Sequence, residues 1–286
     1  MRVSGKLNLM INAPIWILDA FVGTLASRAL RGNPAAVVLL DEFAPDAQLQ
    51  ERANEFGLSE TAFLVSCGPQ NFDLRWFTPQ IEVDLCGHAT LAATAALVDA
   101  KKLLVGQIAR FHTRSGVLKA LVEPERTELD FPVQLVEARE MPDELAQAFG
   151  WDKTERHFEK LFSCFRAADD WLVLVHEAIL QNVRPDFAAL AQIDARGVIL
   201  TAQPEWKTEE ADFYSRFFAP RVGVDEDPVT GSAHTKLAPF WSSRLGKTKM
   251  NAVQLSPRGG RLQLHVRGNR VGIAGQCHLR ARGELC

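Results

Sequence analysis

The stretch FTPQIEVDLCGHAT, from Phe77 to Thr90, decides the fold because a second stretch repeats its design. The second stretch begins FAP at Phe218 and continues, after a short acidic loop, with DEDPVTGSAH from Asp225 to His234. Each indicates a strand that ends at Phe-x-Pro, an acid-bearing loop, and a helix that opens with Gly and a small or polar residue. The pair predicts two similar halves, each with one long helix.

The two predicted helix starts favour an anionic ligand. A helix start carries about four unpaired backbone N–H groups and a partial positive charge, which together bind anions. One start in each half predicts a clamp for a small carboxylate between two similar domains. The residues expected to line this clamp are Gly87, Ala89 and Thr90 in the first half and Gly231, Ser232 and Ala233 in the second.

Apolar patterning around these helices predicts a strand-rich α+β protein with mostly antiparallel strands. In the first half we expect helices at 45–56 and 87–100 and strands at 15–21, 33–40, 61–65, 72–77, 108–112 and 117–122, and the region 127–133 is expected to open the second set of strands. In the second half we expect helices at 143–149, 187–193 and after Gly231, and strands at 171–175, 197–201, 211–218, 252–256, 262–266, 271–274 and near 277–282. The expected domains are 13–125, with the strand at 276–286 as a candidate for completing it, and 126–275.

Composition is that of a soluble globular protein. The chain has 286 residues, 47% of them hydrophobic, and a net charge of −3, which argues against a nucleic-acid binder and an electrostatic membrane anchor. No apolar run approaches the roughly 18 residues of a membrane span, and residues 1–12 are expected to be a loose leader without a signal peptide. The five scattered cysteines indicate a reducing cytoplasm.

Glu60 is a candidate for proton transfer. It lies between a predicted helix end at Gly57 and an apolar strand, with Leu58, Ala62 and Phe63 beside it. Partial desolvation there would raise its pKa toward a value useful in acid–base catalysis. The alternative is a solvated glutamate at a strand edge, and the local context alone favours that alternative.

Three further candidates lie at the predicted helix starts. His88 could handle protons or bind substrate, with a pKa lowered by the helix start, or it could only bond nearby backbone. Asp227 belongs to an acidic run of the kind usually found in solvated loops, but it directly precedes the helix start that it would face. Ser232 could bind a ligand or simply cap the helix.

Cys86 has two open interpretations. A thiol just before a helix start can be a low-pKa thiolate that acts as base or nucleophile, or it can be a small buried hydrophobe. The matching position in the second half is Thr230, so two opposed thiols are not expected. The histidines lack metal-ligand spacing, and no dinucleotide or P-loop motif occurs, so we expect neither a metal nor an organic cofactor.

Taken in order, these segments resemble the PhzF-like family, which is named for the phenazine-biosynthesis isomerase. The likeness runs from Ile15 to the last residues of the sequence. The matching pieces are DAF from Asp19, GNPAAVV from Gly32, LSETAF from Leu58, FTP from Phe77 with Glu82, CGHAT from Cys86, EDPVTGSA from Glu226, and closing strands with Gly275 and Gly283.

The resemblance implies a diaminopimelate epimerase-like fold, in which two similar domains each wrap a barrel-like sheet around a central helix. It implies a site in the cleft between them, where the glutamate of the S-E-T motif, here Glu60, shuttles a proton without a cofactor. The family's other contacts fall at His88, Asp227 and Ser232, and Cys86 matches one of the two cysteine bases of the epimerase. A homodimer is also expected from the resemblance.

These observations lead us to expect a cytoplasmic, biosynthetic isomerase of a small carboxylate. Glu60 would be the acid and base, while His88 and Asp227 position and polarise the substrate. One alternative is racemisation or epimerisation at an α-carbon, with Cys86 or His88 as the opposing base. A second alternative is a non-catalytic small-molecule binder with the same fold, because the fold alone does not choose among these functions.

Overall fold

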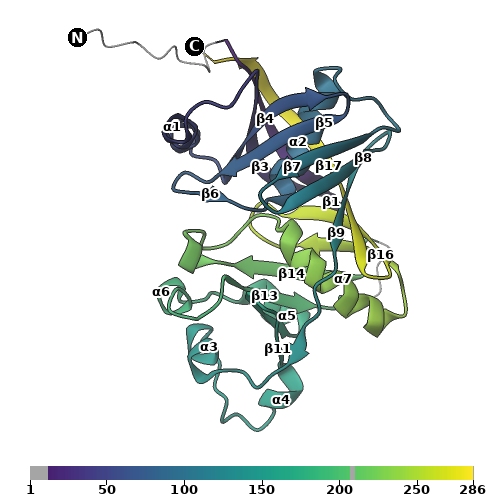
Figure 1. Cartoon of the computed structure of the whole chain (residues 1–286). Helices are drawn as coiled ribbons and strands as arrows, with labels where there is room; N and C mark the ends of the chain where they lie inside the picture. The colour runs from purple at the N-terminus through teal and green to yellow at the C-terminus, as the bar shows by residue number, and fades with distance from the viewer. Residues whose placement is uncertain (1–11, 207–209, 286) are drawn as a thin grey trace, which may run out of the picture. The chain divides into compact units, whose positions relative to one another are not determined.

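The described chain divides into two compact units, and each unit is built from segments distant in the sequence. The computed structural model describes residues 12–206 and 210–285 (Figure 1). The first unit holds the described residues up to Ala20, Asn33–Asp130 and those from Gly275 onward. The second holds Phe21–Gly32 and Phe131–Ala274. The leader expected over residues 1–12 lies, apart from Asn12, outside the described residues.

Eight strands form a closed ring of pairings around the first unit. In order of pairing they are β1 (Pro14–Leu25), β3 (Asn33–Leu40), β4 (Glu60–Gly68), β5 (Asn71–Phe77), β7 (Ile108–Thr113), β8 (Gly116–Val122), β9 (Thr127–Pro132) and β17 (Arg270–Glu284), which pairs with β1 again. The β3–β4 and β5–β7 pairings are parallel, and a short β6 (Glu82–Val83) also pairs with β5.

Helix α2 (Gly87–Asp99) is the central helix of the first unit. Ten of its thirteen residues are buried, and it packs against β3, β4 and β8. Its many alanines explain this position, because small side chains on every face let strands approach a helix from all sides. Helix α1 (Asp46–Phe56) connects the parallel strands β3 and β4, and it buries Leu49 and Ala53 in a smaller cluster with Phe63.

The second unit contains a similar set of strands. They are β10 (Glu137–Ala138), β11 (Ser163–Arg166), β12 (Asp170–Leu174), β13 (Gly197–Ala202), β14 (Phe213–Phe218), β15 (Lys249–Gln254), β16 (Gly260–Arg267) and β17, each paired with the next. Here β12–β13 and β14–β15 are the parallel pairings. Short β2 (Arg28–Leu30) pairs with the end of β1.

The helices of the second unit include one long one. Helix α7 (Gly231–Leu245) packs against β15 and β16 and has most of its residues buried. The shorter helices are α3 (Asp143–Ala148), α4 (Phe158–Leu161), α5 (Glu177–Asn182), α6 (Phe187–Leu190) and the 3-10 turn η1 (Pro220–Val222).

The two units follow one pairing scheme, which confirms the predicted repeat. The series β1–β3–β4–β5–β7–β8 corresponds to β11–β12–β13–β14–β15–β16 in order, in pairing and in strand direction. Helix α2 precedes β7 in the first series, and α7 precedes β15 in the second. Glu60 is the first residue of β4, and Gly197 is the first residue of the corresponding strand β13.

Several predicted boundaries are wrong. The strands expected at 271–274 and near 277–282 are one strand, β17, because Gly275 lies inside a continuous ladder where it weakens the strand pattern without ending it. The helix expected at 187–193 ends at Leu190, and the strand expected at 252–256 begins earlier, at Lys249. The sequence patterns also missed several short elements: β2, β6, β10, β11, α4 and α5.

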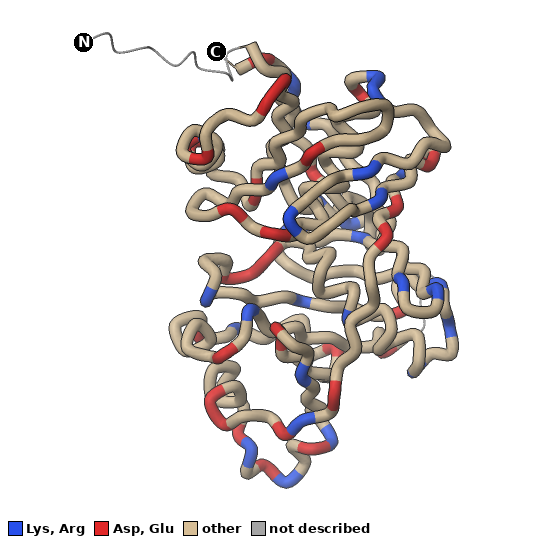
Figure 2. The backbone as a smooth tube through the Cα atoms, in the orientation of Figure 1, with Lys and Arg blue, Asp and Glu red and all other residues tan. Residues whose placement is uncertain are grey.

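Charged residues of both signs are interspersed along the backbone of each unit (Figure 2), in keeping with the net charge of −3. Among the described residues, no helix has both the length and the apolar character that crossing a membrane requires. The four described cysteines, Cys67, Cys86, Cys164 and Cys277, are all free thiols.

Candidate active site

The first unit brings three of the predicted residues together at the start of α2. Glu60 begins β4, Cys86 is the N-cap residue of α2, and His88 lies in the first turn of that helix. Nε2 of His88 lies 3.0 Å from Oε2 of Glu60. On the other side of the ring, Nδ1 of His88 lies 3.5 Å from Sγ of Cys86. We call this group, with Asn33 and Ser59 described below, the α2 site.

The carboxylate and the imidazole face each other in a largely buried place. The side chain of His88 is 5% exposed and that of Glu60 is 19% exposed. Both Oε2 of Glu60 and Nε2 of His88 are shielded from solvent, and neither makes a well-directed hydrogen bond within the described residues. The contact between these two atoms, at 3.0 Å, therefore takes the place of the directed hydrogen bonds that buried polar atoms normally make.

Asn33 and Ser59 complete the α2 site, and the sequence reasoning missed both. Nδ2 of Asn33 lies 3.3 Å from Nδ1 of His88, and the Ser59 hydroxyl donates to Oδ1 of Asn33 over 3.0 Å. Asn33 is fully buried as the first residue of β3. The signals were present, because Asn33 lies in Gly-Asn-Pro and Ser59 directly precedes Glu60. The contact of Asn33 with His88 and the bond of Ser59 to Asn33 depend on strand pairing.

The protonation of the α2 site is set by burial and by its own charges. Burial, together with the nearby Glu60, raises the pKa of the Cys86 thiol, which favours the neutral form over a thiolate. Burial opposes charging of His88, yet the negative charge that Cys86 and Glu60 can carry beside its two ring nitrogens raises the pKa of His88 well above its usual value. An imidazolium beside a carboxylate is therefore favoured here, contrary to the lowered pKa expected at a helix start.

Glu60, Cys86 and His88 are also a group that could hold a metal ion, since one possible ligand atom from each lies within 4.8 Å of the others. In the arrangement described, the thiol faces Nδ1 of His88 and the carboxylate faces Nε2. A single ring nitrogen therefore does not face both groups. This geometry is typical of a proton relay through an imidazole.

The other predicted residues at this helix start are part of its framework. Gly87, Ala89 and Thr90 are buried. The hydroxyl of Thr90 donates to the carbonyl of Cys86, four residues earlier. The backbone N–H of Thr90 also donates to the Cys86 carbonyl, over 3.2 Å, so what this helix start offers a ligand is the backbone N–H groups of Gly87 and Ala89.

The second unit holds the remaining predicted residues at the start of α7. Thr230 is the N-cap, its hydroxyl donates to the carboxylate of Asp227, and its backbone N–H donates to Gln254 Oε1 over 2.9 Å. Gln254 in turn donates to the carbonyl of Asp227 over 2.8 Å. Gly231 and Ala233 are buried, and Ser232 is half-buried. This group is the α7 site, and Gln254 was not predicted.

The acidic run 225–227 is divided between two roles. Glu226 forms a two-pronged ion pair with the largely buried Arg216, at 2.7 and 2.9 Å. Asp225 is exposed, whereas Asp227 is half-buried against the start of α7. Glu226 therefore has a structural role, and Asp227 is the acid of this run that the fold directs toward the helix start.

A buried charge network lies beside Ser232 in the second unit. Lys236, from the second turn of α7, is 1% exposed and places Nζ 2.7 Å from the fully buried Asp170 and 2.9 Å from Asp169. Arg196 also binds Asp170, and its Nη1 donates to Oγ of Ser232 over 3.1 Å. Nothing in the spacing of these residues revealed the network, because strand pairing brings them together.

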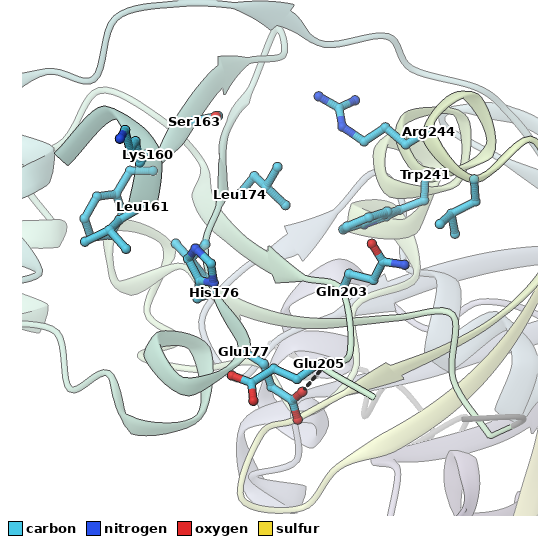
Figure 3. Close-up of a pocket in the computed structure, with 13 residues that line it drawn as sticks. Lys160, Leu161, Ser163, Leu174, His176, Glu177, Gln203, Glu205, Trp241 and Arg244 are labelled. Atoms are coloured by element: carbon cyan, nitrogen blue, oxygen red, sulfur yellow. Dashed lines mark hydrogen bonds between the residues drawn. The ribbon is translucent and has the colours of Figure 1, made fainter. Parts of the chain in front are cut away.

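Two pockets in the second unit lie apart from the predicted residues. One, of about 350 Å³, is lined by residues that include His176, Gln203, Trp241 and Arg244 (Figure 3). At its rim the backbone N–H of Glu205 donates to Glu177 over 2.7 Å, the contact dashed in Figure 3. The other pocket, of about 610 Å³, includes Cys164 in its lining. Neither pocket contains a residue of the α2 or α7 site.

A strand-rich sheet around a central helix, present twice, with the predicted site residues at each helix start, defines the diaminopimelate epimerase-like fold. The chain belongs to the phenazine biosynthesis-like family, whose family model matches residues 18–283. An uncharacterized isomerase from Pseudomonas aeruginosa is 45% identical over 276 residues, which cover 95% of this chain and 98% of the relative.

Solved structures agree with this assignment. A PhzF-family protein from Enterococcus faecalis has a TM-score of 0.84 and 39% identity, covering 96% of this chain and 99% of that one. A probable proline racemase from Agrobacterium radiobacter has a TM-score of 0.58 with 10% identity, covering 96% and 93% of the two chains. The first match supports membership of the family, whereas the second supports the fold alone.

Proposed function

We propose that this protein is a cofactor-independent isomerase that moves a proton within a small carboxylate substrate, with Glu60 as both acid and base. The observation that carries the proposal is the buried approach of Glu60 to His88, at 3.0 Å, with neither atom in a well-directed hydrogen bond. Curated relatives named as isomerases support the reaction class.

The proposed step needs only groups of the α2 site. The Glu60 carboxylate takes a carbon-bound proton, and the electron pair of the broken C–H bond moves into the conjugated system of the substrate. Glu60, now a carboxylic acid, returns the proton to a second carbon on the same face. The charged His88 and the N–H groups at the start of α2 stabilise the negative charge that develops between these events.

The α7 site is proposed to bind the substrate. Its half-buried Ser232 hydroxyl and the backbone N–H groups at the start of α7 suit a carboxylate. The Asp227 carboxylate accepts a hydrogen bond from the Thr230 hydroxyl, and the Asp227 backbone carbonyl accepts one from the Gln254 side chain. These two bonds hold Asp227 beside the helix start. In this assignment Asp227 positions and polarises the substrate.

Deuterium exchange tests the role of Glu60. The wild-type protein and Glu60→Gln are incubated in D₂O with a panel of small amino and hydroxy carboxylates, and incorporation is followed by NMR. We expect wild-type incorporation and a loss of at least about a hundredfold in Glu60→Gln, the typical contribution of general acid–base catalysis. Ligand binding should be largely unchanged, since the amide has the shape of the carboxyl group. A mutant with normal exchange would refute the proposal.

A racemase or epimerase is the second candidate, and one contact favours it. Cys86 Sγ lies 3.5 Å from Nδ1 of His88, so a thiol is placed to exchange a proton through the ring. Such an enzyme would introduce deuterium into both stereoisomers of a substrate and would lose this with Cys86→Ala. The isomerase would instead label a different carbon and keep its activity in that variant.

A further inference from the structure

Asn33 stands between the imidazole of the α2 site and a hydroxyl. Its Nδ2 lies 3.3 Å from Nδ1 of His88, and its Oδ1 accepts from Ser59 over 3.0 Å. Asn33 is fully buried and is the first residue of β3, the strand that pairs with β4. In this orientation the amide presents its N–H groups to Nδ1, which suits a neutral ring whose Nδ1 carries no proton and not the imidazolium that the neighbouring charges favour.

The same side chain can serve the opposite protonation state. An unprotonated Nδ1 accepts a hydrogen bond, whereas a protonated Nδ1 donates one. Half a turn of a side-chain amide exchanges its donor and acceptor ends with no change of shape. A serine hydroxyl donates or accepts as required. Asn33 can therefore pair with His88, and Ser59 with Asn33, before and after His88 gains a proton.

We propose that Asn33 is a positioning residue for proton transfer at the α2 site, because its amide turns over as His88 gains or loses a proton and Ser59 changes role with it. This role rests on the proposed isomerase function, in which His88 faces a carboxylate whose charge is removed and restored in each turnover. By serving both states, Asn33 spares the site a buried, unpaired N–H group at either stage.

The other groups facing His88 decide which protonation state of the ring is favoured, because Asn33 can pair with either state. Glu60 from β4 favours the imidazolium, the start of α2 and burial favour the neutral ring, and Cys86 faces Nδ1 as a thiol. A carboxylate in place of Asn33 would only accept and would favour the imidazolium. An aliphatic side chain there would leave Nδ1–H without its acceptor and would favour the neutral ring.

Substitutions at Asn33 test this reasoning in the substrate-free protein. The pKa of His88 is followed by ¹⁵N NMR in wild type, Asn33→Asp and Asn33→Leu. We expect Asn33→Asp to raise this pKa by about 1–3, as a nearby opposite charge does, and Asn33→Leu to lower it. Asn71→Asp is the matched control, since Asn71 begins β5 and its side-chain amide donates to the carbonyl of Pro69, away from the α2 site. Shifts in the same direction, or none beyond the control, would overturn the proposal.

A second test uses only the wild-type protein, so it does not depend on whether an Asn33 variant folds. Nuclear Overhauser contacts from the Asn33 amide protons are compared above and below the midpoint of His88 titration. We expect contacts to the His88 ring at high pH and to the Ser59 β-protons at low pH, and one fixed orientation throughout would refute the turnover. Neither readout uses substrate, so failure of the isomerase proposal would appear separately, in the D₂O experiment.

Discussion

Two buried histidines respond to pH in opposite directions, although each lies in the first turn or two of a long helix. Glu60 and Cys86 face His88 and raise its pKa well above the usual value despite burial. Among the described residues no acid faces His234 as Glu60 faces His88, and burial lowers the pKa of His234 to about 4, opposed only by its hydrogen bond with the Thr230 carbonyl. The two residues therefore affect folding stability in different pH ranges.

His88 should stabilise the protein at lower pH. Its folded pKa is above the unfolded value of about 6.5, so its contribution is complete below that value and is lost as pH rises through the folded pKa. Each unit by which the pKa is raised corresponds to about 1.4 kcal/mol. Urea unfolding at pH 6 and pH 9 should show a larger fall in wild type than in His88→Asn. Equal falls would contradict the assignment.

His234 should have the opposite effect. It stays neutral in the folded protein, so stability is lost as pH falls from about 6.5 toward the folded pKa of about 4. That interval corresponds to about 3 kcal/mol. In urea unfolding at pH 7 and pH 4.5, His234→Asn should be less stable overall but should lose less stability on acidification than wild type. An unchanged loss would show that other groups cause it.

Residue-level prediction from sequence succeeded where a motif carried the chemistry. Glu60, His88 and Cys86 were named from three short stretches, and the fold places them in one site. Asn33 was not named, because its polar role depends on pairing of β3 with β4 and on a helix 55 residues away. The charge of a neighbour also reversed the direction expected for the pKa of His88.

At the scale of elements, the buried ion network fixes α7 against the strands of its own unit. Asp170 begins β12, Arg196 directly precedes β13, and Lys236 belongs to α7. Asp170 has no exposed surface, and Lys236 is 1% exposed. A buried charge is tolerated only when it is paired and hydrogen-bonded. The three elements therefore depend on one another through charge as well as apolar packing.

Lys236→Met should test that dependence. Removal of one partner from a buried pair typically costs about 3–5 kcal/mol, because the other charge is left uncompensated. The matched control is Lys247→Met, since Lys247 is 56% exposed and pairs with Asp212 at the surface. That control should cost about 0–1 kcal/mol. Urea unfolding compares the two, and Asp170→Asn added to Lys236→Met should recover part of the loss. Equal costs would contradict this account.

The long elements were predicted well because each carries its own pattern. Helices α1, α2 and α7 and strands β3 and β5 begin within a residue or so of the expected positions. Strand β17 was divided in two because glycines interrupt its apolar pattern, and the two-residue strands β6 and β10 are too short to show any period. Parallel pairing of β3 with β4 has no local signature either.

At the scale of the whole chain, the first unit depends on a strand that follows the second unit in sequence. β17 supplies the pairings to β9 and β1 that close the ring of the first unit. Its residues from Gly275 onward belong to that unit, while Arg270–Ala274 belong to the other. Without this strand, β1 and β9 would each expose an unpaired edge.

Deletion of residues 275–286 should therefore unfold the first unit selectively. Hydrogen exchange read by mass spectrometry should show loss of protection in β4, around Phe63 and Leu64, because the ring can no longer close. Protection in β13, around Ile199 and Leu200, serves as the internal control and should persist. Full protection of β4 in the truncated protein would show that the open sheet is stable by itself.

The position of β17 also sets an order of events during synthesis. Domains generally fold as units, with the N-terminal one first as the chain emerges from the ribosome. Here the segment Asn33–Asp130 is made early, but its ring cannot close until the part of β17 from Gly275 onward has been translated, after the whole of Phe131–Ala274. The unit that contains Glu60 and His88 is thus completed last, although both residues lie in the segment that is made early.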